Sequence, residues 1–187
     1  MRYFIGFLVT FGLIVLIIVL LIGGGGKKPI NPTAKPLSLV DYANASSAAQ
    51  IIIDGPVVAD QNHKTLKINV NKDETTLTIY NGYEQNVVNT YNFSNNTTGY
   101  AIFLQSIQRA GFTLHDTKIG YDERGFCPNG ERYIFEFIND GTDLRRSWST
   151  TCGTAIGSAK GQISVILTLF KAQVPDFTKL TGSTQLY

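Results

Sequence analysis

The pattern of apolar and polar residues divides the chain into two unequal parts. From Tyr3 to Ile22 there is no charged residue, and Phe, Leu, Ile and Val predominate. At about 1.5 Å per residue, a helix of this length matches the ~30 Å hydrocarbon core of a bilayer. A helix also satisfies all backbone hydrogen bonds in lipid. We therefore predict a transmembrane anchor over residues 1–22, which contacts membrane lipid through residues 3–22.

The segment that follows the apolar run has a different composition. Residues 23–36 begin with consecutive glycines and continue with lysines and prolines, so this stretch is expected to start flexible and end extended. We interpret it as a stalk that precedes one domain over residues 37–187. A cleaved signal peptide is the alternative to an anchor, although the run exceeds the usual h-region and no A-x-A site follows it.

Strand-like alternation predominates in the first part of this domain and returns later. The segments are Ile51–Ile53, Leu66–Val70, Leu77–Ile79, Val87–Phe93, Tyr133–Ile138 and Leu144–Thr150. Polar turn residues at 71–74 and 139–142 separate neighbouring segments, as in hairpins. These patterns predict antiparallel pairing.

Three other segments carry helical signals, at about Leu39–Ser46, Thr97–Gly111 and Lys160–Gln173. Ser38 is the expected start of a capping box for the first, and Gly111 the C-terminal cap of the second. Pro175 is expected to stop the third. Strands and helices in this order, without a repeating βαβ unit, predict an α+β fold. Its mainly antiparallel sheet has helices packed on one face.

The charge balance excludes a broad class of partners. The chain has 16 Lys+Arg and 14 Asp+Glu, with a net charge of +2, and charged residues make up only 16%. Nucleic-acid binding needs basic residues concentrated on one face or in one run. We therefore expect no nucleic-acid partner, and no motif indicates a cofactor.

Two signals disagree about the side of the membrane on which the domain lies. Lys27, Lys28 and Lys35 follow the apolar run, and the positive-inside rule then predicts a cytoplasmic domain. Cys127 and Cys152, however, lie at nearly matching distances from the turn at 139–142, which predicts a disulfide and an oxidising compartment. Two buried free thiols are the alternative. We favour the extracytoplasmic side.

The histidines offer little catalytic signal. His115 and Asp116 could form a general-base pair, but adjacent residues on an extended chain point to opposite faces. His63 lies in a polar run and is expected in a solvated turn. Histidines and cysteines are scattered without the close pairs typical of zinc sites, so we predict no metal site.

Two further segments contain candidate binding residues. Arg145, Arg146 and Trp148 lie on one strand, with Arg146 and Trp148 on the same face, and form our candidate binding surface. The alternative is that Trp148 packs in the core. The glycine-rich stretch 153–161 lacks the phosphate-loop spacing and is expected to be a flexible loop, with Ser158 as a candidate N-cap.

Three short stretches carry a family resemblance. Arg132–Phe137, Trp148–Gly153 and Val174–Phe177 resemble segments of uncharacterised single-span surface-exposed proteins of small-genome bacteria. This resemblance implies an anchor and an external domain, and no activity. Two hypotheses follow: a tethered binding or structural module of the cell envelope, with an envelope protein or glycan partner, or a membrane-anchored, hydrolase-like enzyme with a site near His115 and Asp116.

Overall fold

The computed structural model describes residues 37–153, 157–182 and 184. The predicted anchor and stalk lie outside these residues. The described part belongs to a unit that begins at Leu37. It contains no helix that is long and apolar enough to cross a membrane.

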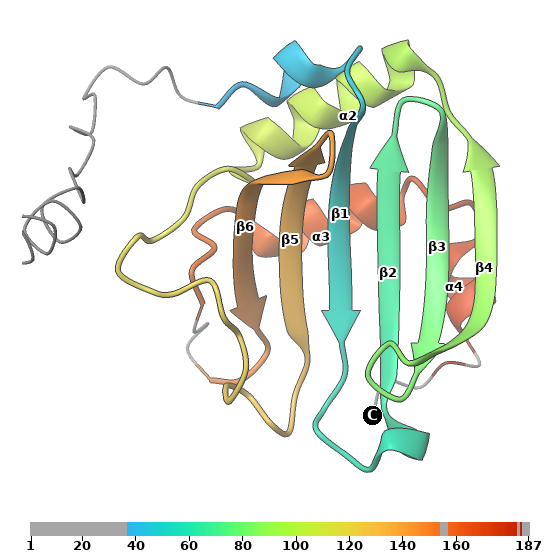
Figure 1. Cartoon of the computed structure of the whole chain (residues 1–187), viewed down its shortest axis with the longest axis vertical. Coiled ribbons are helices and arrows are strands. Elements are labelled where there is room, and N and C mark those ends of the chain that lie inside the picture. Colours follow the sequence, from blue (N-terminus) through green and yellow to red (C-terminus); the bar gives the residue numbers. More distant parts are fainter. Residues whose placement is uncertain (1–36, 154–156, 183, 185–187) are drawn as a thin grey trace, which may run out of the picture. The chain divides into compact units, whose positions relative to one another are not determined.

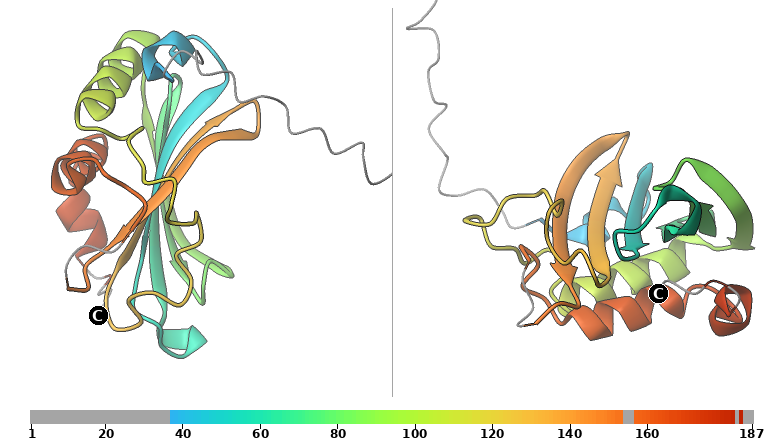
Figure 2. Two further views of the ribbon diagram at one scale, coloured as in Figure 1. Left: turned by 90° about the vertical axis from the view of Figure 1, so that its left-hand side faces the viewer. Right: turned by 90° about the horizontal axis from the view of Figure 1, so that it is seen from below.

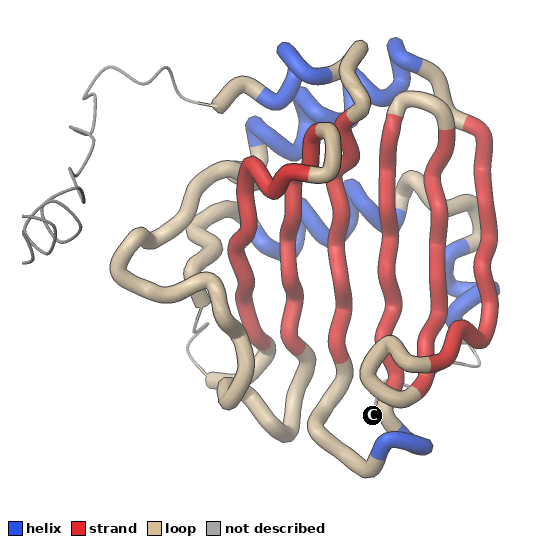
Figure 3. The backbone as a smooth tube through the Cα atoms, in the orientation of Figure 1, coloured by secondary structure: helices blue, strands red, loops and turns tan. Residues whose placement is uncertain are grey.

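Six strands form one sheet in the order β4-β3-β2-β1-β5-β6, and each neighbouring pair is antiparallel (Figures 1 and 3). The strands are β1 (Ser47–Asp54), β2 (Lys64–Asn71), β3 (Glu74–Asn81), β4 (Asn86–Ser94), β5 (Arg132–Asn139) and β6 (Thr142–Thr150). The predicted antiparallel sheet is confirmed. Its order has one long-range feature: β1 lies in the middle, between β2 and the much later β5.

The helices cover one face of the sheet, as predicted (Figure 2). They are α2 (Thr97–Arg109), α3 (Ile163–Lys171) and α4 (Phe177–Thr181), and there are short 3-10 turns η1 (Leu39–Tyr42) and η2 (Asp60–Asn62). The first predicted helix is therefore only η1, and Ser38 makes no side-chain capping bond. Ser158 is not an N-cap either, because α3 follows Gln162. No residue pattern had indicated α4 or η2.

The main core lies between the helices and the sheet. The Asn96 side chain accepts a hydrogen bond from the Gly99 amide at 2.8 Å, which caps the start of α2. Gly111 follows the helix with φ +86°, a conformation that glycine adopts without strain. From α2 and α3, Phe103 and Phe170 meet edge to face in the core, with ring centroids 5.0 Å apart.

The opposite face of the sheet carries a second, smaller apolar cluster. It consists of Ile52, Ile134 and Trp148, with Ile119 packed against it. Ile119 belongs to the long connection from α2 to β5. Residues 114–131 of this connection, which we call the covering loop, start beside residues 158–160 at the outer edge of β6. They then run over the side of the sheet away from the helices (Figure 2). The covering loop gives β5 and β6 a buried surface on both faces.

The β5–β6 hairpin confirms the predicted turn. Asp140 and Gly141 both have positive φ, as the two central residues of a type I′ turn require. Just beyond the turn, Ile138 pairs with Asp143 but Phe137 pairs with Arg145, so Leu144 is an extra residue in a β-bulge. From Arg145 onward the alternation is regular.

Candidate functional site

A disulfide joins Cys127 to Cys152, as predicted from their spacing. Their Cα atoms are 5.4 Å apart, within the ordinary range for a bridge. Cys127 begins a turn in which the Gly130 amide donates to the Cys127 carbonyl at 3.2 Å. The bridge therefore fastens the C-terminal part of the covering loop to the end of β6.

Trp148 attaches the middle of the covering loop to the sheet. Its side chain is 0% exposed, and its indole N–H donates to the Gly120 carbonyl at 2.9 Å. The ring of Phe126 lies against it, with centroids 4.8 Å apart. Trp148 is thus a core residue and not part of a contact surface, which corrects one member of the candidate set.

Arg146 is held in an ion-pair network on the same face as Trp148. Its guanidinium lies 2.9 Å from Glu123 of the covering loop and 3.0 Å from Glu136 of β5, and it also donates to the Tyr121 carbonyl. Burial alone would lower the pKa of Arg146, but Glu123 and then Glu136 raise it above the ordinary value. Arg146 is therefore a fixed cation that positions the covering loop.

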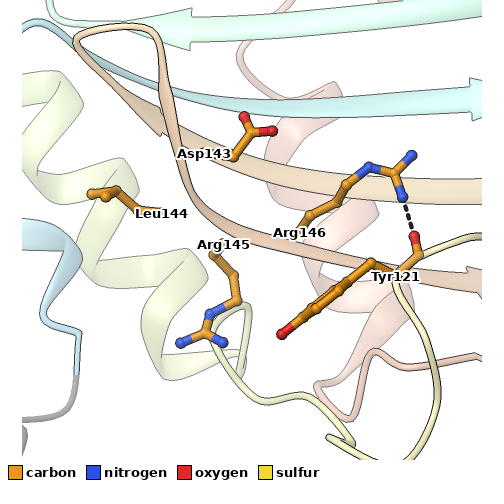
Figure 4. A pocket seen from close by; sticks show the side chains of 5 residues that line it. All are labelled: Tyr121, Asp143, Leu144, Arg145 and Arg146. Carbon is orange, nitrogen blue, oxygen red and sulfur yellow. Dashed lines mark hydrogen bonds between the residues drawn. The ribbon is translucent and has the colours of Figure 1, made fainter. Parts of the chain in front are cut away.

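A hollow of about 340 Å³ opens beside the bulge in β6. It is lined by Tyr121, Asp143, Leu144, Arg145 and Arg146. Figure 4 shows Arg145 and Tyr121 side by side, with Asp143 on the other side of the strand. Tyr121 is 54% exposed. The hollow thus combines an accessible aromatic ring with charged groups of both signs.

Arg145 differs from Arg146 in its partners. One of its terminal nitrogens lies 2.9 Å from Nδ1 of His115, and a guanidinium can only donate, so the imidazole accepts. Within the described part of the chain, no carboxylate forms an ion pair with Arg145. Its Nε is buried and makes no hydrogen bond to any described group. Among the residues that the structure describes, Arg145 therefore has no acidic partner at the wall of the hollow.

The candidate catalytic residues His115 and Asp116 have separate partners. Asp116 lies 3.6 Å from Lys160, while His115 contacts Arg145. The exposed Asp122 pairs with Arg124 at 2.6 Å, and the hydrogen bond from Arg124 lowers the pKa of Asp122 to about 2. Asp116 and Asp122 are therefore each paired with a basic side chain, and the two carboxylates do not form a shared general-acid or general-base arrangement.

His63 lies in a different environment from the one predicted. It is 0% exposed, with Nε2 at 2.7 Å from Asp54 and Nδ1 at 3.0 Å from the Pro56 carbonyl. The Tyr83 ring stacks on it at 3.7 Å. The expectation of a solvated turn was wrong, because distant segments enclose the imidazole. Since Arg132 also contacts Asp54, at 2.5 Å, this cluster joins three strand ends.

Among the residues the structure describes, no group of three His, Cys, Asp or Glu side chains is placed to hold a metal ion. Comparisons with protein-family models, curated proteins and solved structures found no match for the chain. The function is therefore inferred from the chemistry of the site itself. Its most distinctive chemistry is an arginine and a tyrosine presented together beside a strand edge.

Proposed function

We propose that this chain is a membrane-tethered binding module of the cell envelope, with its domain on the extracytoplasmic side. In this proposal residues 3–22 anchor the protein, residues 23–36 act as the stalk, and the hollow beside β6 contacts the partner. The observation that carries the location is the Cys127–Cys152 disulfide. Disulfides persist in oxidising compartments and are rare in the cytosol. The disulfide favours the extracytoplasmic side, although the lysines after the apolar run favour the cytoplasm.

The chemistry of the hollow supports binding to an anionic group. A guanidinium recognises carboxylates and phosphates through charge-assisted, often bidentate hydrogen bonds. Arg145 has no acidic partner within the described part of the chain, so a ligand anion would not have to displace one. Tyr121 adds an exposed aromatic surface of the kind enriched at binding sites. An envelope protein or glycan that carries carboxylates fits this combination.

The alternative of a hydrolase-like enzyme has less support. A general base must lie within hydrogen-bond reach of the group that it activates, and a nucleophile must lie beside its base. His115 instead accepts from Arg145, and Asp116 pairs with Lys160. The thiols are joined in the disulfide, so neither is a free nucleophile.

A comparison of two arginine variants tests the binding role. Arg145→Ala removes the cation at the hollow, whereas Arg124→Ala removes an exposed cation that pairs with Asp122. Binding of the fluorescently labelled protein to envelope preparations from its source cells is measured for both. Loss of a hydrogen-bonded charge costs about 1.5–3 kcal/mol, so Arg145→Ala should weaken binding roughly tenfold or more. Arg124→Ala should leave binding unchanged.

A polyglutamate competitor extends the same experiment to the ligand class. It should displace the wild-type protein from the envelope preparation and have little effect on the residual binding of Arg145→Ala. Equal affinity of the two arginine variants, or insensitivity of the wild type to polyglutamate, would contradict an anion contact at Arg145.

A further inference from the structure

The two edges of the sheet are protected very differently. The outer edge of β6 is covered at Trp148, where the backbone carbonyl accepts from Ala159 at 2.9 Å and the amide donates to Ser158 Oγ at 3.1 Å. Gly157 fits so closely that a Cβ there would lie 2.3 Å from the Trp148 carbonyl oxygen. A specific segment of the chain thus covers this part of β6.

The other edge strand, β4, has no such cover from the described part of the chain. It pairs with β3 alone and lies at the end of the strand order (Figure 1). Residues 86–90 are all exposed, and the Val87 side chain is 60% exposed. An edge strand presents unpaired backbone N–H and C=O groups, which form a template for another strand.

The sequence of β4 also lacks most of the usual protective devices. Its nine residues, NVVNTYNFS, contain no charged residue and no proline, whereas protected edges commonly carry lysine, inward charges or proline. A bulge opposite Ile79 and Tyr80 is its one irregularity. The strand is therefore long, uncharged and accessible, all of which favour pairing.

We infer that β4 is an interaction surface at which two copies of this chain pair, antiparallel, to make one continuous sheet. Two identical strands related by a two-fold axis present complementary donors and acceptors, and the contact is isologous. With no charged residue in β4, this pairing places no like charges opposite one another.

A second copy fits this edge better than an unrelated peptide for a further reason. The pairing uses only backbone groups and neutral side chains, so we expect it to be weak between dilute molecules. Here the inference rests on the proposed function, because copies anchored in one membrane meet at the high local concentration that offsets a weak contact. The self-pairing does not depend on the ligand hollow, which lies at the opposite edge of the sheet, beside β6.

Cysteine cross-linking of the full chain in the intact membranes of the cells that express it tests this inference. One cysteine at a time replaces each of residues 88 to 92, and oxidised samples are separated by non-reducing electrophoresis. Residues opposite one another in an antiparallel pair have Cα atoms about 4.5–5.5 Å apart, which suits a disulfide. Covalent dimer should concentrate at the one or two positions next to the two-fold axis. Asp143→Cys on β6 is the matched position at the other edge and should stay monomeric.

A pair of charge variants provides the second arm. Val87→Lys is added to the single-cysteine variant that gives the most covalent dimer. It places a charge on each copy at the pairing edge and should abolish the dimer. Val57→Lys changes a valine of similar exposure, 52% against 60%, outside the sheet and should leave the dimer intact. The inference is overturned if no position from 88 to 92 gives more dimer than Asp143→Cys, or if both lysine variants behave alike.

Discussion

The Nε2 atom of His63 lies 2.7 Å from Asp54 Oδ1, inside the protein, and joins the loop after β1 to the strand itself. The other ring nitrogen meets the Pro56 carbonyl, so both polar atoms of the imidazole have partners. Tyr83 closes the site from the β3–β4 turn by stacking on the ring. One side chain therefore holds together two connections at the same end of the sheet.

Replacing His63 with alanine should destabilise the fold by about 2–4 kcal/mol, because it leaves a void and removes the hydrogen-bond partner of the Pro56 carbonyl. His115→Ala is the matched control, since His115 is only half buried and contacts Arg145. It should cost less than about 1 kcal/mol. Urea denaturation of both variants measures the difference, and equal losses would show that the His63 site is not a structural centre.

The helix faces give a second prediction. Phe103→Ala and Phe170→Ala should each cost about 3–5 kcal/mol, since both rings are buried in the main core. Gln105→Ala and Lys171→Ala change exposed positions of the same two helices and should cost little. The double variant Phe103→Ala/Phe170→Ala should reveal a coupling of about 0.5–1.5 kcal/mol between the rings. Similar free energies of unfolding for all four single variants would mean that these helices bury other faces.

The close approach of Gly157 to β6 leads to a third prediction. Gly157→Ala inserts a methyl group into backbone contact and should destabilise the protein by about 1–3 kcal/mol. Gly120→Ala is the control, because a Cβ there would meet nothing within 4 Å. Thermal unfolding should therefore separate the two glycine variants. If Gly157→Ala unfolded at the wild-type temperature, the cover over Trp148 would be looser than described.

Tyr100 gives a pH prediction. Burial raises the pKa of its hydroxyl to about 12, although a hydrogen bond with Ser47 at 3.0 Å opposes this rise. The unfolded chain loses this proton near the ordinary value of about 10 and the folded chain does not, so stability falls as pH rises between those values. The loss amounts to roughly 2–3 kcal/mol.

Comparison with Tyr100→Phe isolates this effect from other alkaline titrations. The variant should lose about 1 kcal/mol at neutral pH, because Ser47 loses one partner, and its stability should fall less steeply above pH 10. Parallel stability curves for the two proteins from pH 9 to 11.5 would show that Tyr100 does not contribute to alkaline unfolding.

Local patterns predicted most of the regular elements, and the reasons are visible in particular residues. The stripe Tyr100, Phe103, Leu104 and Ile107 is buried as its spacing indicated, and Asp140-Gly141 forms the turn that those residue types favour. The sheet order was not predictable, because the insertion of β1 between β2 and β5 depends on pairing between segments far apart in the chain.

The candidate site was predictable only in part, for the same reason. The alternation along β6 correctly placed Arg145 and Arg146 on opposite faces of the sheet, and the cysteine spacing indicated the disulfide. The covering loop carries Ile119 and Phe126 without a periodic pattern, so nothing indicated that it would bury Trp148. The residues next to His63 in the sequence are polar, so the local pattern indicated an exposed position. Its burial comes instead from Tyr83 and Asp54, which lie elsewhere in the chain.

The Cys127–Cys152 bridge is central both to the stability of the domain and to its proposed location. Closing a loop of 25 residues should stabilise the fold by about 3.5 kcal/mol in the chain-entropy model. That is a large share of the ~5–15 kcal/mol typical of a folded domain. Reduction should therefore lower the unfolding temperature markedly.

The most direct test is mass spectrometry of the protein from intact membranes, denatured and alkylated first without and then with reductant. We predict no alkylated cysteine before reduction and two afterwards, with Cys127 and Cys152 in one cross-linked peptide pair. Two alkylated cysteines in the unreduced sample would contradict both the bridge in the native protein and the extracytoplasmic location proposed from it.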